Sequence, residues 1–299
     1  MLLDYGSPEA SYQPPQGTRV AGILDLLDLM RYTRAPMSAA DVAATRSAIA
    51  RSPDEMFRDY GQFLDPRGRL TVDTGSDYVG KPLPERKWLR DIVEGDYTLR
   101  DYLADSPSAD LFGDDLSRIK VGATADLPPN FSAGYTPASG FTDKSGNYQM
   151  VQPGFVVVRP GQGGPQLGAA VEHELTHAYQ NILSSPRGTT TDEMAGPMIE
   201  YLTEIGALPP AKLARIDDAA KKAGISRAAG RYYSSSGEAG ARAAEAAYLR
   251  RQGGVNAAPS DADFLNIPGG GTIRKSMLFD IPADADAGFK EWWAKKWKK

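Results

Sequence analysis

Cysteine is absent from this 299-residue chain, and histidine occurs only twice. The lack of cysteine excludes a disulfide framework, a thiolate metal site and a cysteine nucleophile. No uncharged apolar run approaches the ~20 residues that a membrane-spanning helix needs. The formal net charge of −4 argues against a general nucleic-acid binder. These absences are compatible with a reducing compartment, or with a chain that crosses membranes unfolded.

In the N-terminal third, the sequence pattern predicts helices and no targeting segment. The first residues have neither a basic segment nor a long apolar segment, so we expect no Sec signal peptide. Residues 1–17 are rich in Pro, Gly and Ser and predict a flexible arm. Apolar spacing and capping residues predict helices at 19–34, 38–50, from 53 onward and at 85–104, with turns around 65–84. We therefore expect a mostly helical region over residues 18–105.

Short strands are expected after residue 106. Residues 154–159 form the clearest one, a β-branched run bounded by Pro153 and Pro160. Residues 119–123 and 131–135 are further candidates. The segment 160–165 predicts a turn, and it lacks the Lys-Ser/Thr ending of a phosphate-binding loop.

Both histidines lie in the run 171–177, Val-Glu-His-Glu-Leu-Thr-His, which is the H-E-x-x-H pattern of zinc peptidases. Pro165 and an apolar stripe at spacings of three and four predict a helix over 165–183. His173 and His177 then lie one turn apart on the same face, where both can hold one ion. Glu174 lies ~100° around the helix and can act as a general base on water.

Catalytic zinc usually has three protein ligands, and here the third must be a carboxylate because no other His or Cys exists. One candidate segment, an expected helix, carries Glu200 and Glu204. The other is an Ala-rich helix on which Glu238, Arg242 and Glu245 share a face. Glu238 could bind zinc while Arg242 and Glu245 hold it in place. The same spacing also fits a solvated salt-bridge face.

The runs 171–181 and 237–242 resemble gluzincin-type zinc peptidases, most closely the zincin domains of large polyvalent proteins from phages and mobile elements. ImmA/IrrE-type peptidases are similar. In these families His-Glu-Leu-x-His-Ala-x-Gln is followed by Gly-Glu-x-Glu-Ala-Arg, whereas this chain has Gly240 at the second acidic position. The resemblance covers roughly residues 150–250. It implies an α+β zincin fold with a small sheet over the motif helix, and it favours Glu238 as the third ligand.

These features predict a zinc-dependent endopeptidase in residues 106–289, acting on a protein or peptide. Zn²⁺ would activate water and polarise the scissile carbonyl, and Glu174 would carry the proton to the leaving amine. Tyr232 and Tyr233 are candidates for stabilising the oxyanion, although two packing tyrosines are the simpler interpretation. The resemblance also implies that the strand at 155–159 is an edge that binds substrate as an added strand.

Two other functions stay open. A binding or structural protein on a zincin fold could hold the metal and cleave nothing. Asp73 lies in an Asp-Thr-Gly-Ser run like that of aspartic peptidases, whose chemistry needs two carboxylates sharing a proton. The run occurs once, so only a dimer could supply the pair, and a tight turn is the simpler interpretation.

The last ten residues, Lys290–Lys299, carry five Lys, one Glu and three of the four Trp. We expect a terminal helix that docks its Trp on the body and leaves Lys in water. The alternative is a weak contact with an anionic surface. The lack of a Sec signal and the phage-like resemblance favour a cytoplasmic protein, or one delivered by a virion or a non-Sec secretion system. The oligomeric state stays open.

Overall fold

The computed structural model describes residues 47, 50–60, 62–68, 70–72, 82–104, 113–129, 131–142, 148–161, 163–182, 186–267 and 271–297. All of them belong to the larger of two units, Arg46–Lys299. The predicted arm over 1–17, the predicted helix over 19–34 and most of that over 38–50 lie outside the described residues. Asp73 lies outside them as well.

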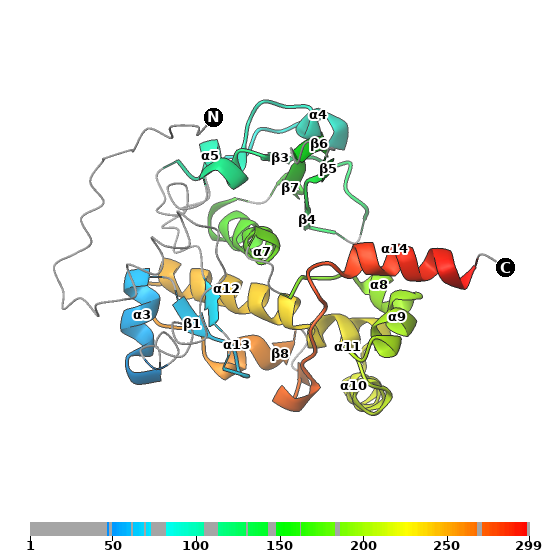
Figure 1. Cartoon of the computed structure of the whole chain (residues 1–299). Helices are drawn as coiled ribbons and strands as arrows, with labels where there is room; N and C mark the ends of the chain where they lie inside the picture. Colours follow the sequence, from blue (N-terminus) through cyan, green and yellow to red (C-terminus); the bar gives the residue numbers. More distant parts are fainter. Residues whose placement is uncertain are drawn as a thin grey trace, which may run out of the picture. The chain divides into compact units, whose positions relative to one another are not determined.

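The described unit is α+β, and its central sheet has three strands in the order β3-β7-β4. β3 (Ile119–Ala123) runs parallel to β7 (Gly154–Val158), and β4 (Ala133–Thr136) runs antiparallel to it (Figure 1). The β-branched run of β7 is buried along its whole length. All three strands lie at or within two residues of their predicted positions.

The expectation that residues 155–159 form a substrate-binding edge is wrong. β7 is the central strand, so β3 and β4 already use the hydrogen-bonding groups on its two sides. A strand paired on both sides cannot accept a third partner. Among the described residues, β4 pairs with β7 alone, so β4 is an edge strand of this sheet.

The helix α7 (Gly164–Ile182) packs between the sheet and α12 (Ser236–Gln252), and its bounds agree with the predicted helix to within one residue. Its contact with the sheet forms the main core, which includes Val121, Val156, Val158, Leu167, Val171 and Leu175. On its other side, Gly168 meets Tyr248 of α12. A Cβ at Gly168 would lie 1.9 Å from the Tyr248 hydroxyl, so only glycine permits this close approach.

The described residues before 105 form both helices and strands. Their elements are α3 (Pro53–Tyr60), β1 (Gln62–Leu64), β2 (Leu70–Val72), α4 (Leu89–Val93) and α5 (Leu99–Tyr102). The single helix predicted over 85–104 is wrong, because α4 ends at Val93 and Thr98 caps a new helix. The Thr98 hydroxyl accepts a hydrogen bond from the Asp101 N–H at 3.2 Å, and the Asp101 carboxylate accepts one from the Thr98 N–H.

The expected boundary at 105/106 does not separate two cores. Leu99 and Tyr102 of α5 belong to the same buried cluster as Ile119 and Val156 of the sheet. Phe57 of α3 likewise belongs to a cluster with residues of α12. The described part of the N-terminal region is therefore built into the α+β unit.

A second cluster of helices follows α7 in the sequence. It consists of α8 (Thr191–Ala195), α9 (Met198–Glu204), α10 (Pro210–Lys222), α11 (Arg227–Ser234) and α14 (Ala285–Lys296). Met194, Leu202 and Ile216 belong to the core that these helices share. The remaining elements are the hairpins β5 (Ser139–Thr142)–β6 (Tyr148–Gln152) and β8 (Asn266–Ile267)–β9 (Gly271–Thr272), with α13 (Asp261–Leu265) and η1 (Lys275–Met277). Every described helix is too short or too polar to span a lipid bilayer.

Candidate metal centre

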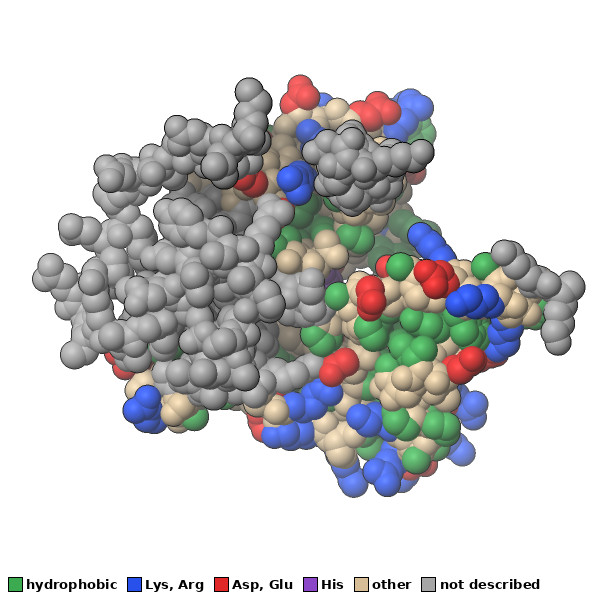
Figure 2. Space-filling model, viewed as in Figure 1, with side chains coloured by type: hydrophobic (Ala, Val, Ile, Leu, Met, Phe, Trp, Pro, Cys, Tyr) green, Lys and Arg blue, Asp and Glu red, His purple; other side chains and the backbone are tan. Residues whose placement is uncertain are grey.

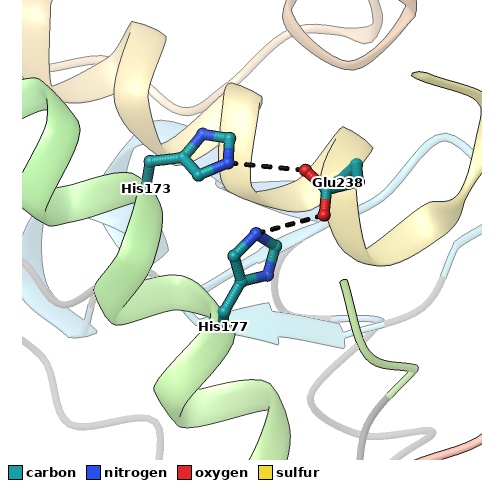
Figure 3. A group of neighbouring side chains, drawn as sticks. All are labelled: His173, His177 and Glu238. Atoms are coloured by element: carbon teal, nitrogen blue, oxygen red, sulfur yellow. Dashed lines mark ion pairs between the residues drawn. The ribbon is translucent and has the colours of Figure 1, made fainter. Parts of the chain in front are cut away.

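Two helices bring three metal-binding side chains together. His173 and His177 lie one turn apart on α7, and Glu238 comes from the first turn of α12 (Figure 3). Nε2 of His173 lies 3.4 Å from Oε2 of Glu238, and Nε2 of His177 lies 3.3 Å from Oε1 of Glu238. One ligand atom from each residue lies within 4.8 Å of the other two, so this group could hold a metal ion.

Glu238 has the surroundings of a metal ligand. It is 1% exposed, and its Oε1 accepts a hydrogen bond from the Thr189 N–H at 2.7 Å. Its Oε2 is buried without a hydrogen-bond partner and faces the imidazole of His173. A buried carboxylate is costly unless it is paired or coordinates a metal. Two imidazole nitrogens and a carboxylate oxygen also suit Zn²⁺, so the donor set fits this ion.

The charges in this group are strongly coupled. Burial disfavours protonated His173, but Glu238 and Glu245 outweigh it and raise the pKa of His173 to about 10. Burial likewise opposes the charge of His177, and Glu238 raises its pKa. Burial favours neutral Glu238, yet the two imidazoles hold its pKa well below the usual range. Without a metal, protons therefore supply the positive charge that the buried carboxylate requires.

Each imidazole is oriented through its other ring nitrogen. Nδ1 of His173 lies 3.2 Å from Oε2 of Glu245, and Nδ1 of His177 lies 3.0 Å from Oε1 of Gln180. The Gln180 amide in turn donates to the carbonyl of Gly237 at 2.9 Å. Such outer contacts fix the orientation of ligating histidines. Glu245 was expected to hold Glu238, and it contacts His173 instead.

Gln180 and two glycines were given no role from the sequence. Gln180 follows His177 by three residues, and this spacing on a helix is the signal that points to it. A Cβ at Gly188 would lie 2.3 Å from Cε1 of His177, and one at Gly237 would lie 2.2 Å from the carbonyl oxygen of Arg187. Glycine at these positions lets the 187–189 segment pass directly over the site.

Arg242 acts on the backbone rather than on Glu238 directly. Its Nη2 donates to the carbonyls of Tyr233, at 3.0 Å, and Phe264, at 2.9 Å. Its guanidinium also lies over the Tyr233 ring, 5.2 Å from the centroid. Arg242 therefore fastens the end of α11 to α12, and its link to Glu238 is the attraction of opposite charges.

The two predicted tyrosines have different surroundings. Burial is the main factor that raises the pKa of Tyr232, and the negative charge of Glu238 raises it further. Tyr232 thus lies close enough to the metal group to feel its charge. Tyr233 packs against Arg242 instead.

The alternative ligands Glu200 and Glu204 lie outside the group. Oε2 of Glu200 pairs with Nζ of Lys296 at 2.6 Å, and Oε2 of Glu204 accepts a hydrogen bond from Nε1 of Trp292 at 2.8 Å. Both carboxylates therefore bind α14. Their predicted helix exists as α9, but its two carboxylates attach α14 to α9.

Glu174 is buried beside the two histidines without being one of the three ligands. Burial is the main cause of its raised pKa, although the charges of His173 and His177 oppose the shift. A buried carboxyl group with a raised pKa, next to a cation site, is suited to accept and release a proton.

A small area of histidine surface is visible in a recess of the molecule in Figure 2, with acidic and hydrophobic side chains beside it. A cavity of about 430 Å³ lies between α8, α9 and α14, and Glu193, Met198 and Phe289 are among its lining residues. Oε2 of Glu193 accepts a hydrogen bond from the Thr189 hydroxyl at 2.7 Å. Thr189 therefore connects this cavity to Glu238.

Comparison of the chain with protein-family models, curated proteins and solved structures finds no match in any of the three. The chemistry of the site is therefore inferred from its own residues and from their arrangement.

Proposed function

We propose that this protein is a zinc-dependent endopeptidase. The convergence of His173, His177 and Glu238 beside the buried Glu174 supports this function most directly. Catalytic zinc usually has three protein ligands, whereas structural zinc usually has four. The described residues supply three. The small sheet packed against α7 agrees with a zincin-like fold.

The metal ion and Glu174 would have different tasks in peptide hydrolysis. Zn²⁺, when bound, supplies Lewis acidity that polarises a carbonyl and lowers the pKa of water toward ~7. A carboxylate oxygen of Glu174 accepts the proton of the attacking water and then delivers it to the leaving nitrogen. The raised pKa of Glu174 favours the first of these steps, because a more basic carboxylate takes the proton from water more readily.

Tyr232 is the candidate for stabilising the oxyanion. Its raised pKa keeps the hydroxyl protonated at neutral pH, so it can donate a hydrogen bond. Arg242 holds the carbonyl and the ring of the neighbouring Tyr233, and this contact fixes the end of α11 that carries Tyr232. Arg242 is thus a positioning residue.

A peptide substrate would find an edge and a cavity near the site. β4 is an edge strand among the described residues, and Tyr135 on it interacts with Asn181 near the end of α7. An extended peptide can pair with such an edge. The cavity beside Glu193 is large enough for a substrate side chain.

The test compares wild type with Glu174→Gln on a peptide library, after zinc content has been measured by elemental analysis. Wild type should hold one zinc per chain, cleave, and lose activity with a chelator. Glu174→Gln should keep the zinc and lose about 10²–10⁴-fold in rate. Glu204→Gln is the control and should keep full activity, because this carboxylate of α9 bonds to Trp292 of α14 and lies outside the metal group. Cleavage that is independent of Glu174, or a protein unable to hold zinc, would refute the proposal.

The same experiment covers the other two candidates. Bound metal without any cleavage would favour a metal-holding binding protein. The burial of Glu174 argues against that function, because a buried carboxyl group costs stability when it has no chemical role. Cleavage that survives a chelator and disappears in Asp73→Asn would favour the aspartic peptidase.

We further propose delivery by a virion or a non-Sec secretion system. Support comes from the resemblance of 171–181 and 237–242 to domains of phage-borne proteins. Mass spectrometry of particles and culture supernatants should detect the protein there. Strictly cytosolic material would contradict this part of the proposal.

A further inference from the structure

The helix α14 has one face that is docked on the body. Phe289 and Trp292 each lie 5.9 Å from the Tyr201 ring of α9, measured between centroids. Trp292 also donates to Glu204, and Lys296 pairs with Glu200. The helix begins at Ala285, so the Trp- and Lys-rich residues 290–296 continue a longer helix. The expectation that the tail docks its Trp on the body is met by Trp292.

Two further tryptophans remain exposed, Trp293 on α14 and Trp297, which caps the end of this helix. Trp293 is 39% exposed and Trp297 is 65% exposed, and their ring centroids lie 5.4 Å apart. A helix advances ~100° per residue, so Trp293, Trp297 and Lys290 share an arc of ~60° beside the docked face. Single exposed apolar residues are common, but two touching tryptophans on consecutive turns form a patch.

One lysine lies on the patch itself. Lys290 is exposed on the same arc, whereas Lys295 is exposed ~160° around the helix from Trp293. Residues 290–299 carry five Lys and one Glu, a formal charge of +4, whereas the remainder of the chain carries −8. The formal charge of residues 290–299 is thus opposite in sign to that of the rest of the chain.

We propose that the exposed face of α14, defined by Lys290, Trp293 and Trp297, binds the surface of an anionic lipid bilayer. Tryptophan is suited to the boundary between headgroups and acyl chains, because its ring is apolar and its N–H is polar. Lysines beside it are attracted to negatively charged headgroups. The docked face of α14 stays on the protein, so binding needs no unfolding of the helix.

The charge distribution favours lipid over a second copy of this chain. Two copies meeting through this face would bring the exposed Lys290 of each copy into the contact, and like charges at a contact are unfavourable. A nucleic-acid duplex would meet the lysines, but its bases are stacked inside it and would leave the two adjacent tryptophans without a partner. The combination of ring pair and charge fits a surface that is negative outside and apolar beneath.

The experiment measures sedimentation of the full chain with phosphatidylcholine vesicles, with and without phosphatidylglycerol. Wild type should bind only vesicles that contain phosphatidylglycerol, and added salt should weaken the binding. Trp293→Ala/Trp297→Ala should weaken binding at least ~10-fold, because the binding strength follows the buried apolar area. Lys290→Gln should weaken it about fivefold, and Lys295→Gln, on the opposite side of the helix, should weaken it less.

A matched control removes two exposed apolar side chains elsewhere. Leu249 and Val255 are similarly exposed, and Leu249→Ala/Val255→Ala should bind like wild type. Thermal melting of each variant verifies the fold. No binding to phosphatidylglycerol vesicles, equal binding to both vesicle types, or binding that needs lysine but not tryptophan would each overturn the proposal. A Trp293-dependent dimer in light scattering, without lipid binding, would show that a second copy covers the face.

Discussion

Oε2 of Glu245 lies 3.2 Å from Nδ1 of His173, across the contact between α12 and α7. This carboxylate holds the ring so that Nε2 faces Glu238. Glu245→Ala should therefore lower zinc affinity by about 10–100-fold and leave the fold intact, because the side chain of Glu245 is partly exposed. Competition with a fluorescent chelator measures the affinity. Glu200→Ala, at the carboxylate that pairs with Lys296, should have no effect; a comparable loss there would argue against this role.

Gly188 is predicted to be essential for the metal centre. A Cβ at this position would lie 2.3 Å from Cε1 of His177 and 2.6 Å from Oε1 of Glu238. Gly188→Ala should displace both ligands, abolish stoichiometric zinc binding and destabilise the protein by about 1–3 kcal/mol. Gly163→Ala is the control, because its Cβ would meet nothing within 4 Å. Zinc content and thermal melting decide; full zinc binding by Gly188→Ala would contradict the geometry.

Tyr232 and Tyr233 form a matched pair for testing catalysis. Tyr232→Phe removes the hydroxyl near Glu238 and should lower kcat by about 10²–10³-fold, with zinc affinity unchanged. Tyr233→Phe keeps the ring that stacks on Arg242 and should retain near-normal kcat. Steady-state kinetics on a peptide that the wild type cleaves provide the comparison. Equal losses in the two variants would remove Tyr232 from the mechanism.

Zinc binding should release protons. The raised pKa of His173, about 10, means that its imidazole carries a proton at pH 7 in the metal-free protein, and the pKa of His177 is raised as well. A metal ligand must be deprotonated, so binding should release at least one proton. Calorimetric titrations in buffers of different ionisation enthalpy count them. A binding enthalpy that is the same in every buffer would show that the imidazoles are already neutral.

The metal-free protein should become less stable as the pH rises. The folded pKa of His173, about 10, lies above its ordinary value of 6.5. The stability from its protonated form is therefore complete below pH 6.5 and is lost as the pH rises through about 10. Thermal melting of chelator-treated protein across this range should show a falling Tm. Zinc-loaded protein should not follow the same curve, since its imidazoles are already deprotonated.

Local patterns predicted the helix that carries the motif. The apolar spacing in residues 165–183 requires one buried face, and α7 buries that face against the sheet. The spacing of residues 238, 242 and 245 likewise predicted that Glu238 and Glu245 share one helix, which is α12. Spacing alone could not choose between Glu238 and Glu200, because that choice depends on which helix packs against α7. The resemblance to gluzincins favoured Glu238, and the packing of α12 brings it to the histidines.

Other features depend on contacts between distant segments and left no local signal. A β-branched run such as that of β7 is compatible with both an edge strand and a central strand. Only the pairing with β3 and β4 shows that β7 is the central strand of the sheet. Residues 85–104 are an exception, because the capping box of Thr98 and Asp101 that divides them is a local pattern that the prediction missed. The role of Gly188 follows from the proximity of His177 and Glu238, which lie on different elements.

The packing of Gly168 against Tyr248 also bears on which ion can enter. Because the Tyr248 side chain of α12 packs directly on the backbone of α7 at Gly168, the two helices have little freedom to slide past each other. The span between the imidazoles and the carboxylate is thereby set by a contact that lies more than one helical turn away from His173. A small tetrahedral ion suits such a fixed trio, whereas calcium, with six to eight oxygen ligands, would need more donors and a wider cage. Gly168 would then contribute to the selectivity for a metal ion that it does not contact.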